Sequence, residues 1–294
     1  MQNILIGSLK LSTNNLGDHI QIIAMNNLLK LNNLTPTIFL DRDHEVSKCK
    51  TLDKIDSKLF VVFNGWFKIN GDQWPPNDKI IPLFIGFHMR LTTCPELLSD
   101  EAITYYKKYE PIGCRDIFTK NKLINKGIDA YISHCLTLTL PTRIKNPSTQ
   151  NKIIVASRDR KLLNLLPKYI SKDAIYINHI TNDFDHDINM KKAIKLCNFY
   201  RNNAKLIITT FLHGSLFAIA TGIPVVVFYP YHPSHNYKRK SKSDRERFSS
   251  LIDLVPIYTF SQINEVNFNP DPIDITKLKN DIIDNFNSYL NKIF

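Results

Sequence analysis

Short apolar runs alternate along the chain with longer segments in which apolar and polar residues mix. The runs are rich in Val, Ile and Phe and are too short for helices, which is typical of strands buried on both faces of a parallel sheet. In segments such as 18–31, apolar residues recur every three or four positions and predict amphipathic helices. This alternation indicates βαβ units, and therefore an α/β fold rather than a β-sandwich.

The same pattern predicts two domains. Before residue 141 we expect strands at 3–7, 37–40, 59–63, 80–87, 111–114 and 130–133, and helices at 18–31, 96–109 and 117–125. After residue 150 we expect strands at 152–156, 174–178, 206–208 and 222–228, and helices at 161–170, 190–202, 215–221, 247–254 and 275–293. Residues 141–150 are polar, contain two prolines and lack periodicity, as a linker does. We therefore predict Rossmann-like domains at 1–140 and 151–294, the second closed by the C-terminal helices, facing each other across a cleft.

Composition and charge narrow the class of protein. The 294 residues are 43% hydrophobic and 22% charged, as in a globular protein. No leader-like segment and no apolar run near the ~18 residues of a membrane span is present, so we expect a soluble, cytoplasmic protein. The five cysteines are scattered and His19, His88 and His179 lack metal-site spacing, so we predict neither disulfides nor a metal. The net charge of +11 favours an anionic partner, which is a phosphorylated substrate, an anionic membrane surface or nucleic acid.

Residues 205–228 carry the strongest candidate for chemistry. A buried strand runs into a polar His213-Gly214-Ser215 turn, which is followed by a helix and a second buried strand. Ligands of open parallel sheets bind at the carboxyl ends of strands, where helix N-termini favour anions. The turn is therefore either an anion site with a titratable group or a histidine hydrogen-bonded under a loop.

Five segments, taken in order, resemble the polysaccharide pyruvyl transferase family. They are residues 15–21 (NLGDHIQ), 110–116 (EPIGCRD), 133–140 (SHCLTLTL), 209–215 (TTFLHGS) with 222–225 (GIPV), and 244–251 (DRERFSSL). The resemblance implies a GT-B-like architecture, with the acceptor bound by 1–140 and the donor by 151–294. It implies transfer of the pyruvyl group of phosphoenolpyruvate, with no other cofactor and no nucleic acid, to a sugar or lipid-linked oligosaccharide. The product belongs to a cell-surface polysaccharide and is made at the cytoplasmic face of a membrane, with peripheral contact to anionic lipid.

The donor chemistry explains which residues such a site needs. Phosphoenolpyruvate carries a carboxylate and a phosphate, which arginines and helix N-termini hold, and its methylene carbon must be protonated by a general acid with a pKa near neutrality. By resemblance, His213 is the catalytic histidine. The commonest family pattern has Arg two positions earlier, where this chain has Phe211. Either another cation replaces that Arg, or the donor differs, or the transferase activity has been lost.

Several arginines and lysines are candidates for that cation. Arg115 follows a predicted strand and either binds the donor or pairs with Asp116 on the surface. Arg158 also follows a strand, but its turn is equally typical of a solvated loop. The basic run 237–247 is either a solvated loop or a lid that grips phosphate, and its candidate binding residues are Lys238, Arg239 and Arg245.

The first helix supplies candidates on the acceptor side. Asn15 and Gly17 open this helix and are predicted to line the cleft. Asp18 is either a general base toward the acceptor hydroxyl or a first-turn carboxylate that complements the helix dipole. Trp66 and Trp74 either form a sugar-stacking loop or pack against the domain edge.

Two other functions fit the same sequence. One is a glycosyltransferase that uses a nucleotide sugar in the same cleft. The other is a non-catalytic member of the family that binds a glycan or scaffolds other enzymes. Phe211 is the feature that favours both over a pyruvyl transferase.

Overall fold

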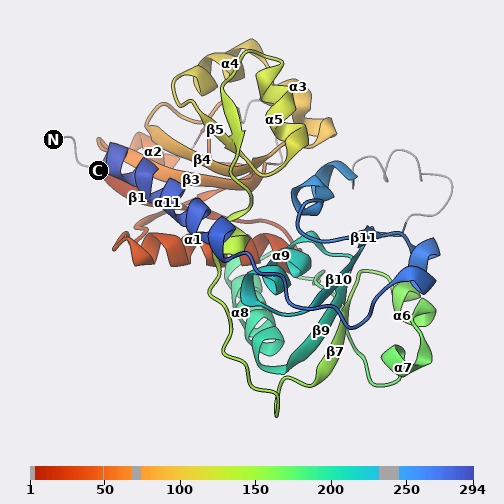
Figure 1. Ribbon diagram of the computed structural model, residues 1–294. Coiled ribbons are helices and arrows are strands. Elements are labelled where there is room, and N and C mark those ends of the chain that lie inside the picture. The colour runs from red at the N-terminus through yellow and green to blue at the C-terminus, as the bar shows by residue number, and fades with distance from the viewer. Residues whose placement is uncertain (1–3, 49, 68–73, 232–244) are drawn as a thin grey trace.

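The structure is a computed structural model that describes residues 4–48, 50–67, 74–231 and 245–294 (Figure 1). Its first sheet has six strands in the order β2-β1-β3-β4-β5-β6, and every neighbouring pair is parallel. The strands are β1 (Ile4–Lys10), β2 (Ile38–Asp41), β3 (Lys58–Trp66), β4 (Ile80–His88), β5 (Ile112–Cys114) and β6 (Ala130–Ile132). Each lies on or beside a predicted apolar run.

The second sheet has five parallel strands in the order β11-β10-β9-β7-β8. They are β7 (Lys152–Ala156), β8 (Ile175–Ile177), β9 (Ala204–Thr209), β10 (Val225–Phe228) and β11 (Ile257–Tyr258). Strand β11 was not predicted, because two residues carry too little pattern. The two parallel sheets confirm the predicted α/β class and the GT-B-like pair of Rossmann-like halves.

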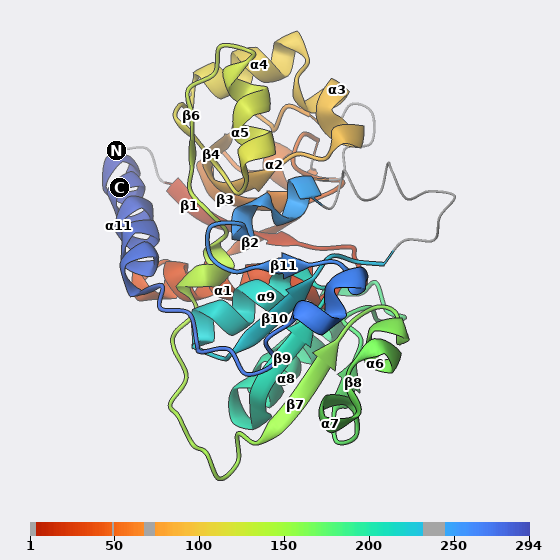
Figure 2. The same ribbon diagram turned by 45° about the vertical axis from the view of Figure 1, so that its right-hand side comes forward.

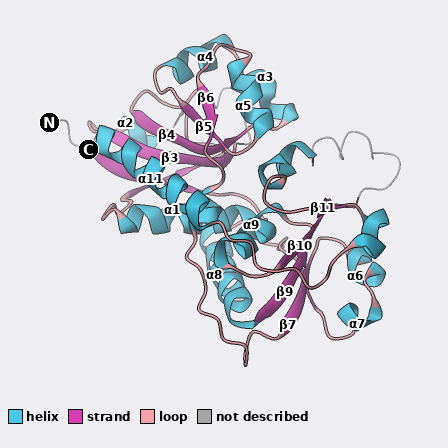
Figure 3. Ribbon diagram, viewed as in Figure 1, coloured by secondary structure: helices cyan, strands magenta, loops and turns pink. Residues whose placement is uncertain are grey.

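The helices surround the strands of each half (Figure 3). They are α1 (Leu16–Leu31), α2 (Lys50–Asp53), α3 (Cys94–Leu97), α4 (Asp100–Lys107), α5 (Ile117–Ile124), α6 (Lys161–Leu165), α7 (Lys168–Ser171), α8 (His186–Asn203), α9 (Leu212–Thr221) and α11 (Thr276–Ile293). Helices α8 and α9 lie on the side of the second sheet nearer α1, and α6 and α7 lie on the other (Figure 1).

Local caps and one proline explain where the helices depart from the prediction. The predicted helix 96–109 is two helices, because Ser99 has extended backbone and its side chain caps α4 at the Ala102 N–H. The predicted helix 161–170 ends at Leu165 and resumes at Lys168, because Pro167 disfavours helical backbone in the residue before it. In place of the predicted helix 247–254, the structure has a short helical turn that ends as a 3-10 helix at Ser249–Leu251.

The two halves are joined along α1. The loop before α1 pairs with the segment after β8, since the Leu16 N–H donates to the His179 carbonyl at 2.9 Å and the Thr181 N–H donates to the Asn14 carbonyl at 2.9 Å. Helix α1 packs against α8 and α9, and a single hydrophobic cluster continues through both halves. The carboxyl edges of the two sheets are therefore held in a fixed relation on this side of the cleft.

The last helix returns to the first sheet. Helix α11 runs beside α1 and β1 (Figure 2), where the Phe294 ring lies 5.4 Å from Phe60 and the Asn285 amide donates to the Tyr131 hydroxyl at 2.9 Å. Its apolar side is buried there, because Ile282, Phe286 and Leu290 are shielded from solvent. The final helix of the predicted C-terminal domain therefore covers the N-terminal half. The boundaries at 140 and 150 stay predictions.

Candidate functional site

The N-termini of α1 and α9 meet between the two sheets. Helix α9 begins at Leu212, three residues earlier than predicted, so His213 lies in its first turn. His213 packs directly on Gly17 of α1, where a Cβ atom would lie 2.9 Å from His213 Nδ1 and 3.1 Å from its Cβ. Only glycine leaves room for this contact. The structure therefore brings two predicted site residues together from segments that are distant in the sequence.

His213 is a buried, neutral imidazole. Its side chain is 6% exposed, and among the described residues its Nε2 atom has no hydrogen-bond partner. Burial lowers the pKa of His213 well below its ordinary value, and the charges of Arg115 and Arg247 lower it further. It is therefore unprotonated at pH 7, which differs from the near-neutral pKa expected of a general acid.

Asn15, rather than Asp18, caps α1. The Asn15 side chain accepts a hydrogen bond from the Gly17 N–H at 3.1 Å, as an N-cap residue does. Asp18 is buried one turn further on, where its Oδ1 accepts from the Asn15 amide at 3.4 Å and lies 3.9 Å from His213 Nδ1. Asp18 thus accompanies His213, and both residues are buried.

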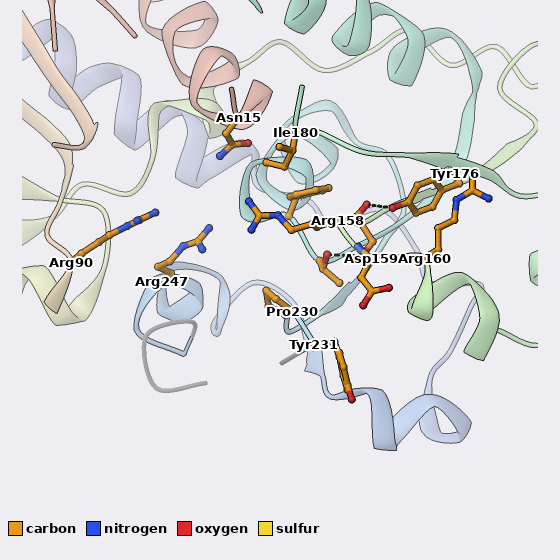
Figure 4. Close-up of a pocket in the computed structure, with 13 residues that line it drawn as sticks. Asn15, Arg90, Arg158, Asp159, Arg160, Tyr176, Ile180, Pro230, Tyr231 and Arg247 are labelled. Atoms are coloured by element: carbon orange, nitrogen blue, oxygen red, sulfur yellow. Dashed lines mark hydrogen bonds between the residues drawn. The ribbon is translucent and has the colours of Figure 1, made fainter. Parts of the chain in front are cut away.

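A cavity of about 660 Å³ lies between the two halves, next to these helix ends. Asn15 and Arg90 line it from the N-terminal half, and the C-terminal half supplies the rest of the wall (Figure 4). Among the described residues, its charged lining consists of four arginines and one aspartate, which are Arg90, Arg158, Arg160, Arg247 and Asp159. This excess of positive charge suits a ligand that carries more than one negative group.

Arg90 and Arg247 reach into the cavity from one side, and Arg158 extends toward them from the opposite wall (Figure 4). Arg90 lies over the Trp66 ring, with its guanidinium carbon 3.8 Å from the ring centroid. Burial lowers the pKa of Arg90 to about 10, and the charge of Arg247 adds to this. Trp66 therefore supports an arginine rather than stacking on a sugar, and Trp74 is buried in an aromatic cluster with Phe63 and Phe67.

Only one of the three basic residues predicted after β10, Arg245, lies within the described part of the chain. Lys238 and Arg239 lie outside the described residues. Arg245 is exposed and does not line the cavity, whereas Arg247, two positions later in the same motif, does. Arg247 and Arg90 are the cavity arginines that the sequence analysis missed. The signal for Arg90 was its position just after a predicted strand.

Arg115 is buried and belongs to a polar cluster at the ends of β4 and β5. It is 1% exposed, and its Nε lies 3.7 Å from Asp116 Oδ2, so it is not the surface ion pair that was the alternative. Asp116 caps α5 at the Thr119 N–H, at 2.9 Å, and its other oxygen lies 2.5 Å from His88 Nδ1. Burial would raise the pKa of Asp116, but the hydrogen bond from His88 and the charge of Arg115 hold it below its ordinary value.

Gly214 and Ser215 shape α9 and do not line the cavity. The Ser215 hydroxyl donates to the Phe211 carbonyl at 3.1 Å, and Ser215 is fully buried. A Cβ atom at Gly214 would lie 3.2 Å from the His179 ring, so glycine permits close packing there. Both residues are buried outside the cavity lining, and their contact with substrate stays a prediction.

Phe211 lines the cavity at the start of α9. Its ring lies flat on His179, with 4.3 Å between the ring centroids, and His179 Nε2 shares a hydrogen bond with the Tyr200 hydroxyl at 2.7 Å. Because phenylalanine has no oxygen, the Phe211 side chain does not cap the first N–H groups of α9. Such a helix end attracts anions.

No group of three or more metal-ligating side chains occurs within the described ranges. Within the same ranges, no helix is long and apolar enough to cross a membrane.

A search of curated proteins finds no match. Among solved structures, an uncharacterised protein of Klebsiella pneumoniae is 15% identical, with a TM-score of 0.48 over 87% of this chain and 93% of that one. A protein of Listeria monocytogenes named as a candidate UDP-N-acetylglucosamine 2-epimerase is 9% identical, with a TM-score of 0.45 over 99% of this chain and 98% of that one.

Comparison of the chain with models of protein families identifies its family. The family model described as polysaccharide pyruvyl transferase matches residues 15–232, which include the cap of α1, the Arg115-Asp116 cluster and the first turn of α9. Arg247 lies beyond the matched residues. The match covers well over half of the sequence, and the chain therefore belongs to the polysaccharide pyruvyl transferase family.

Proposed function

We propose that the protein transfers the pyruvyl group of phosphoenolpyruvate to a hydroxyl of a cell-surface polysaccharide or of its sugar precursor. The observation that carries this proposal is the set of arginines that line one cavity beside His213. Family membership supports a transferase, and the cavity supports a donor with two anionic groups.

The donor fits the charges of the cavity. Its carboxylate and phosphate need planar, bidentate donors, which arginine supplies better than lysine. Arg90 and Arg247 approach from one wall and Arg158 from the other, so they can hold two anionic groups on one molecule. In this arrangement Arg90 and Arg247 replace the arginine that the family's commonest pattern has at the position of Phe211.

Donor binding also prepares His213 for acid catalysis. The imidazole is neutral in the empty site because it is buried among arginine charges. A bound dianion offsets those charges and raises the pKa of His213, so that a proton is taken up with the donor. The protonated Nε2 then gives this proton to the methylene carbon, and a sugar hydroxyl attacks the neighbouring carbon to form an enol ether or a ketal.

A nucleotide-sugar glycosyltransferase is the second candidate. The far end of the cavity contains Tyr176, with the Arg160 guanidinium carbon 4.7 Å from its ring centroid, and Tyr231. Aromatic and cationic groups of this kind also suit a base and a diphosphate. In either case the acceptor is a sugar or lipid-linked oligosaccharide, and we propose that the protein acts at the cytoplasmic face of a membrane.

A panel of donors distinguishes the two functions by thermal stabilisation. Phosphoenolpyruvate, inorganic phosphate and several nucleotide sugars are added separately, and the melting temperature is measured. A ligand at 100 times its dissociation constant adds about 2.7 kcal/mol to the free energy of unfolding. We expect phosphoenolpyruvate to stabilise the protein more than phosphate does, because it uses both anion positions. Stabilisation by nucleotide sugars alone would refute the pyruvyl transferase proposal.

A further inference from the structure

Four neighbouring strands of the first sheet end at or near buried polar atoms that make no hydrogen bond with the described residues. These atoms are Nδ2 and Oδ1 of Asn64 in β3, Nε2 of His88 at the end of β4, Nε of Arg115 after β5, and Nδ1 of His134 after β6. None has a hydrogen-bond partner among the described residues. Because about 90% or more of buried polar groups in proteins are paired, such a row marks a place where a polar ligand completes the hydrogen bonding. A sugar, with a hydroxyl on nearly every carbon, has that chemistry.

His88 is the member of this row that is built for proton transfer. Its Nδ1 lies 2.5 Å from Asp116 Oδ2, and Asp116 is fixed in turn by the Thr119 N–H at 2.9 Å and the Thr119 hydroxyl at 3.0 Å. A carboxylate accepts but does not donate, so Nδ1 carries the proton of the neutral ring. Nε2 is left with a free lone pair and no hydrogen-bond partner in the described part of the chain, which is the state of a base.

The charges around His88 keep it in that state. The groups that face it are Asp116 on α5, Arg115 after β5, and Arg247 from the C-terminal half. Burial lowers the pKa of His88 to about 4, Arg115 adds to this, and Asp116 only partly opposes it. His213 is near enough for His88 to influence its titration. The two imidazoles, one from each half of the molecule, therefore belong to one electrostatically coupled group of residues.

We propose that His88, positioned by Asp116, accepts the proton of the attacking sugar hydroxyl, and that the strand ends from β3 to β6 bind the acceptor sugar. This inference rests on the pyruvyl transferase function proposed above. It assigns the role of base to His88, whereas Asp18, beside His213, accompanies the acid.

The proton and electron balance of the step is simple. The π electrons of the donor's double bond take the proton from His213 Nε2 to form a C–H bond at the methylene carbon. A lone pair of the acceptor oxygen forms the bond to the adjacent carbon, and the hydroxyl proton passes to His88 Nε2. Phosphate then leaves with the electrons of its C–O bond. A second hydroxyl then attacks the same carbon and gives its proton to the now neutral His213 Nε2, which closes the ketal. Alternatively, the methyl group gives a proton to that atom, and its C–H electrons form the double bond of the enol ether.

His88→Asn is the sharpest test, because the Asn amide can still donate to Asp116 in place of Nδ1 while Nε2 is removed. Asp116→Asn is the second variant, since asparagine can still cap α5 but no longer carries a charge. His186→Gln is the matched control. His186 Nδ1 accepts a hydrogen bond from the Leu11 N–H at 3.1 Å, and a glutamine side chain can still accept it. The assay measures release of inorganic phosphate from phosphoenolpyruvate with a panel of p-nitrophenyl glycosides as acceptors.

We expect His88→Asn to lower kcat by about 10²–10⁴, the usual effect of losing a positioned proton-transfer group, while phosphoenolpyruvate still raises the melting temperature as in the wild type. His186→Gln should match the wild type in both measurements. Phosphate release by His88→Asn at the wild-type rate would overturn the inference and leave the proposed function intact. A wild-type protein that neither releases phosphate nor is stabilised by phosphoenolpyruvate would overturn both.

A nitrogen-15 NMR spectrum of the histidine rings tests the same point without an acceptor. We expect His88 in the wild type to be neutral between pH 6 and 8, with its proton on Nδ1. In Asp116→Asn the two tautomers should mix, because an amide can either accept or donate. A proton on Nε2 of the wild-type ring, or a charged ring in this range, would overturn the assignment of His88 as the base.

Discussion

Replacing Gly17 with alanine should separate the stability of the protein from its turnover. Gly17 lies in the first turn of α1 with ordinary helical backbone, so alanine would stabilise an isolated helix by up to ~1 kcal/mol. The added Cβ, however, would lie 2.9 Å from His213 Nδ1 and 3.2 Å from Asn15 Oδ1, whereas ordinary contact begins at 3.4 Å. Relief of the closer contact requires the His213 ring to move by about half an ångström.

The two effects act on different measurements. Overpacking costs about 1–3 kcal/mol, which the helix propensity of alanine partly offsets, so the net loss of stability should be within ~2 kcal/mol. This corresponds to a fall in melting temperature of roughly 4 °C or less in a chain of this size. Turnover should fall more steeply, by about 10- to 100-fold, because displacement of a reacting group by 1 Å can reduce the rate about 10²-fold.

The assay compares melting curves and phosphate release for Gly17→Ala and for Asn27→Ala. Asn27 is exposed in the middle of the same helix, so its replacement should add about 0.5 kcal/mol of stability and leave turnover unchanged. Full turnover in Gly17→Ala would refute the idea that the contact between α1 and α9 positions His213. A loss of turnover no larger than the loss of folded protein would refute it as well.

Four further predictions follow from charge and burial. Arg90→Gln should weaken phosphoenolpyruvate binding by about 10- to 100-fold, as expected for the loss of a charge-assisted hydrogen bond, and should not lower the melting temperature. An unchanged dissociation constant in calorimetry would show that Arg90 does not bind the donor. Phe211→Arg places a guanidinium on the flat His179 ring and adds positive charge to the cavity, so it should tighten donor binding. Weaker binding in the same titration would show that another cation already binds the anionic group there. Binding of phosphoenolpyruvate at pH 7 should take up a proton at His213, measured by calorimetry in buffers of different ionisation enthalpy, and this uptake should vanish in His213→Gln. Burial lowers the pKa values of His88 and His179 to about 4 and about 3, so below pH 6.5 the unfolded chain binds more protons than the folded one. The free energy of unfolding should therefore be full above pH 6.5 and fall by about 2 kcal/mol per histidine at pH 5. A urea midpoint that does not change between pH 7.5 and 5 would contradict this.

The strands could be predicted because each is a contiguous apolar run, and their parallel arrangement follows from the helices between them. The helix ends could not be predicted equally well. They depend on single caps and on one proline, such as Ser99 and Pro167, whose effect is local and leaves the periodicity unchanged. The path of α11 was missed for another reason. Its amphipathic pattern shows that one side is buried but does not show against which half.

The candidate site shows the same limit. His213 and Gly17 were each predicted from a local motif, but their contact depends on how α1 packs against α9. Arg245 was predicted and Arg247 was not, because both lie in one basic motif and nothing in the sequence distinguishes them. In a helical turn, two positions are separated by about 200°, so only one of the two arginines can face the cavity. His88 looked like an isolated histidine, because its partner Asp116 is distant in the sequence.

The charges at the site lead to a single view of how donor and acid depend on each other. Burial first, and then the charges of neighbouring arginines, lower the pKa values of Arg90, Arg115 and His213 together, so positive charge is unfavourable at this site. A donor with two anionic groups supplies the missing negative charge, and by linkage it binds more tightly when His213 is protonated. A low pKa in the empty site is therefore compatible with an acid in the complex. The proton arrives with the molecule that will receive it, and before that His213 stays neutral beside the arginines.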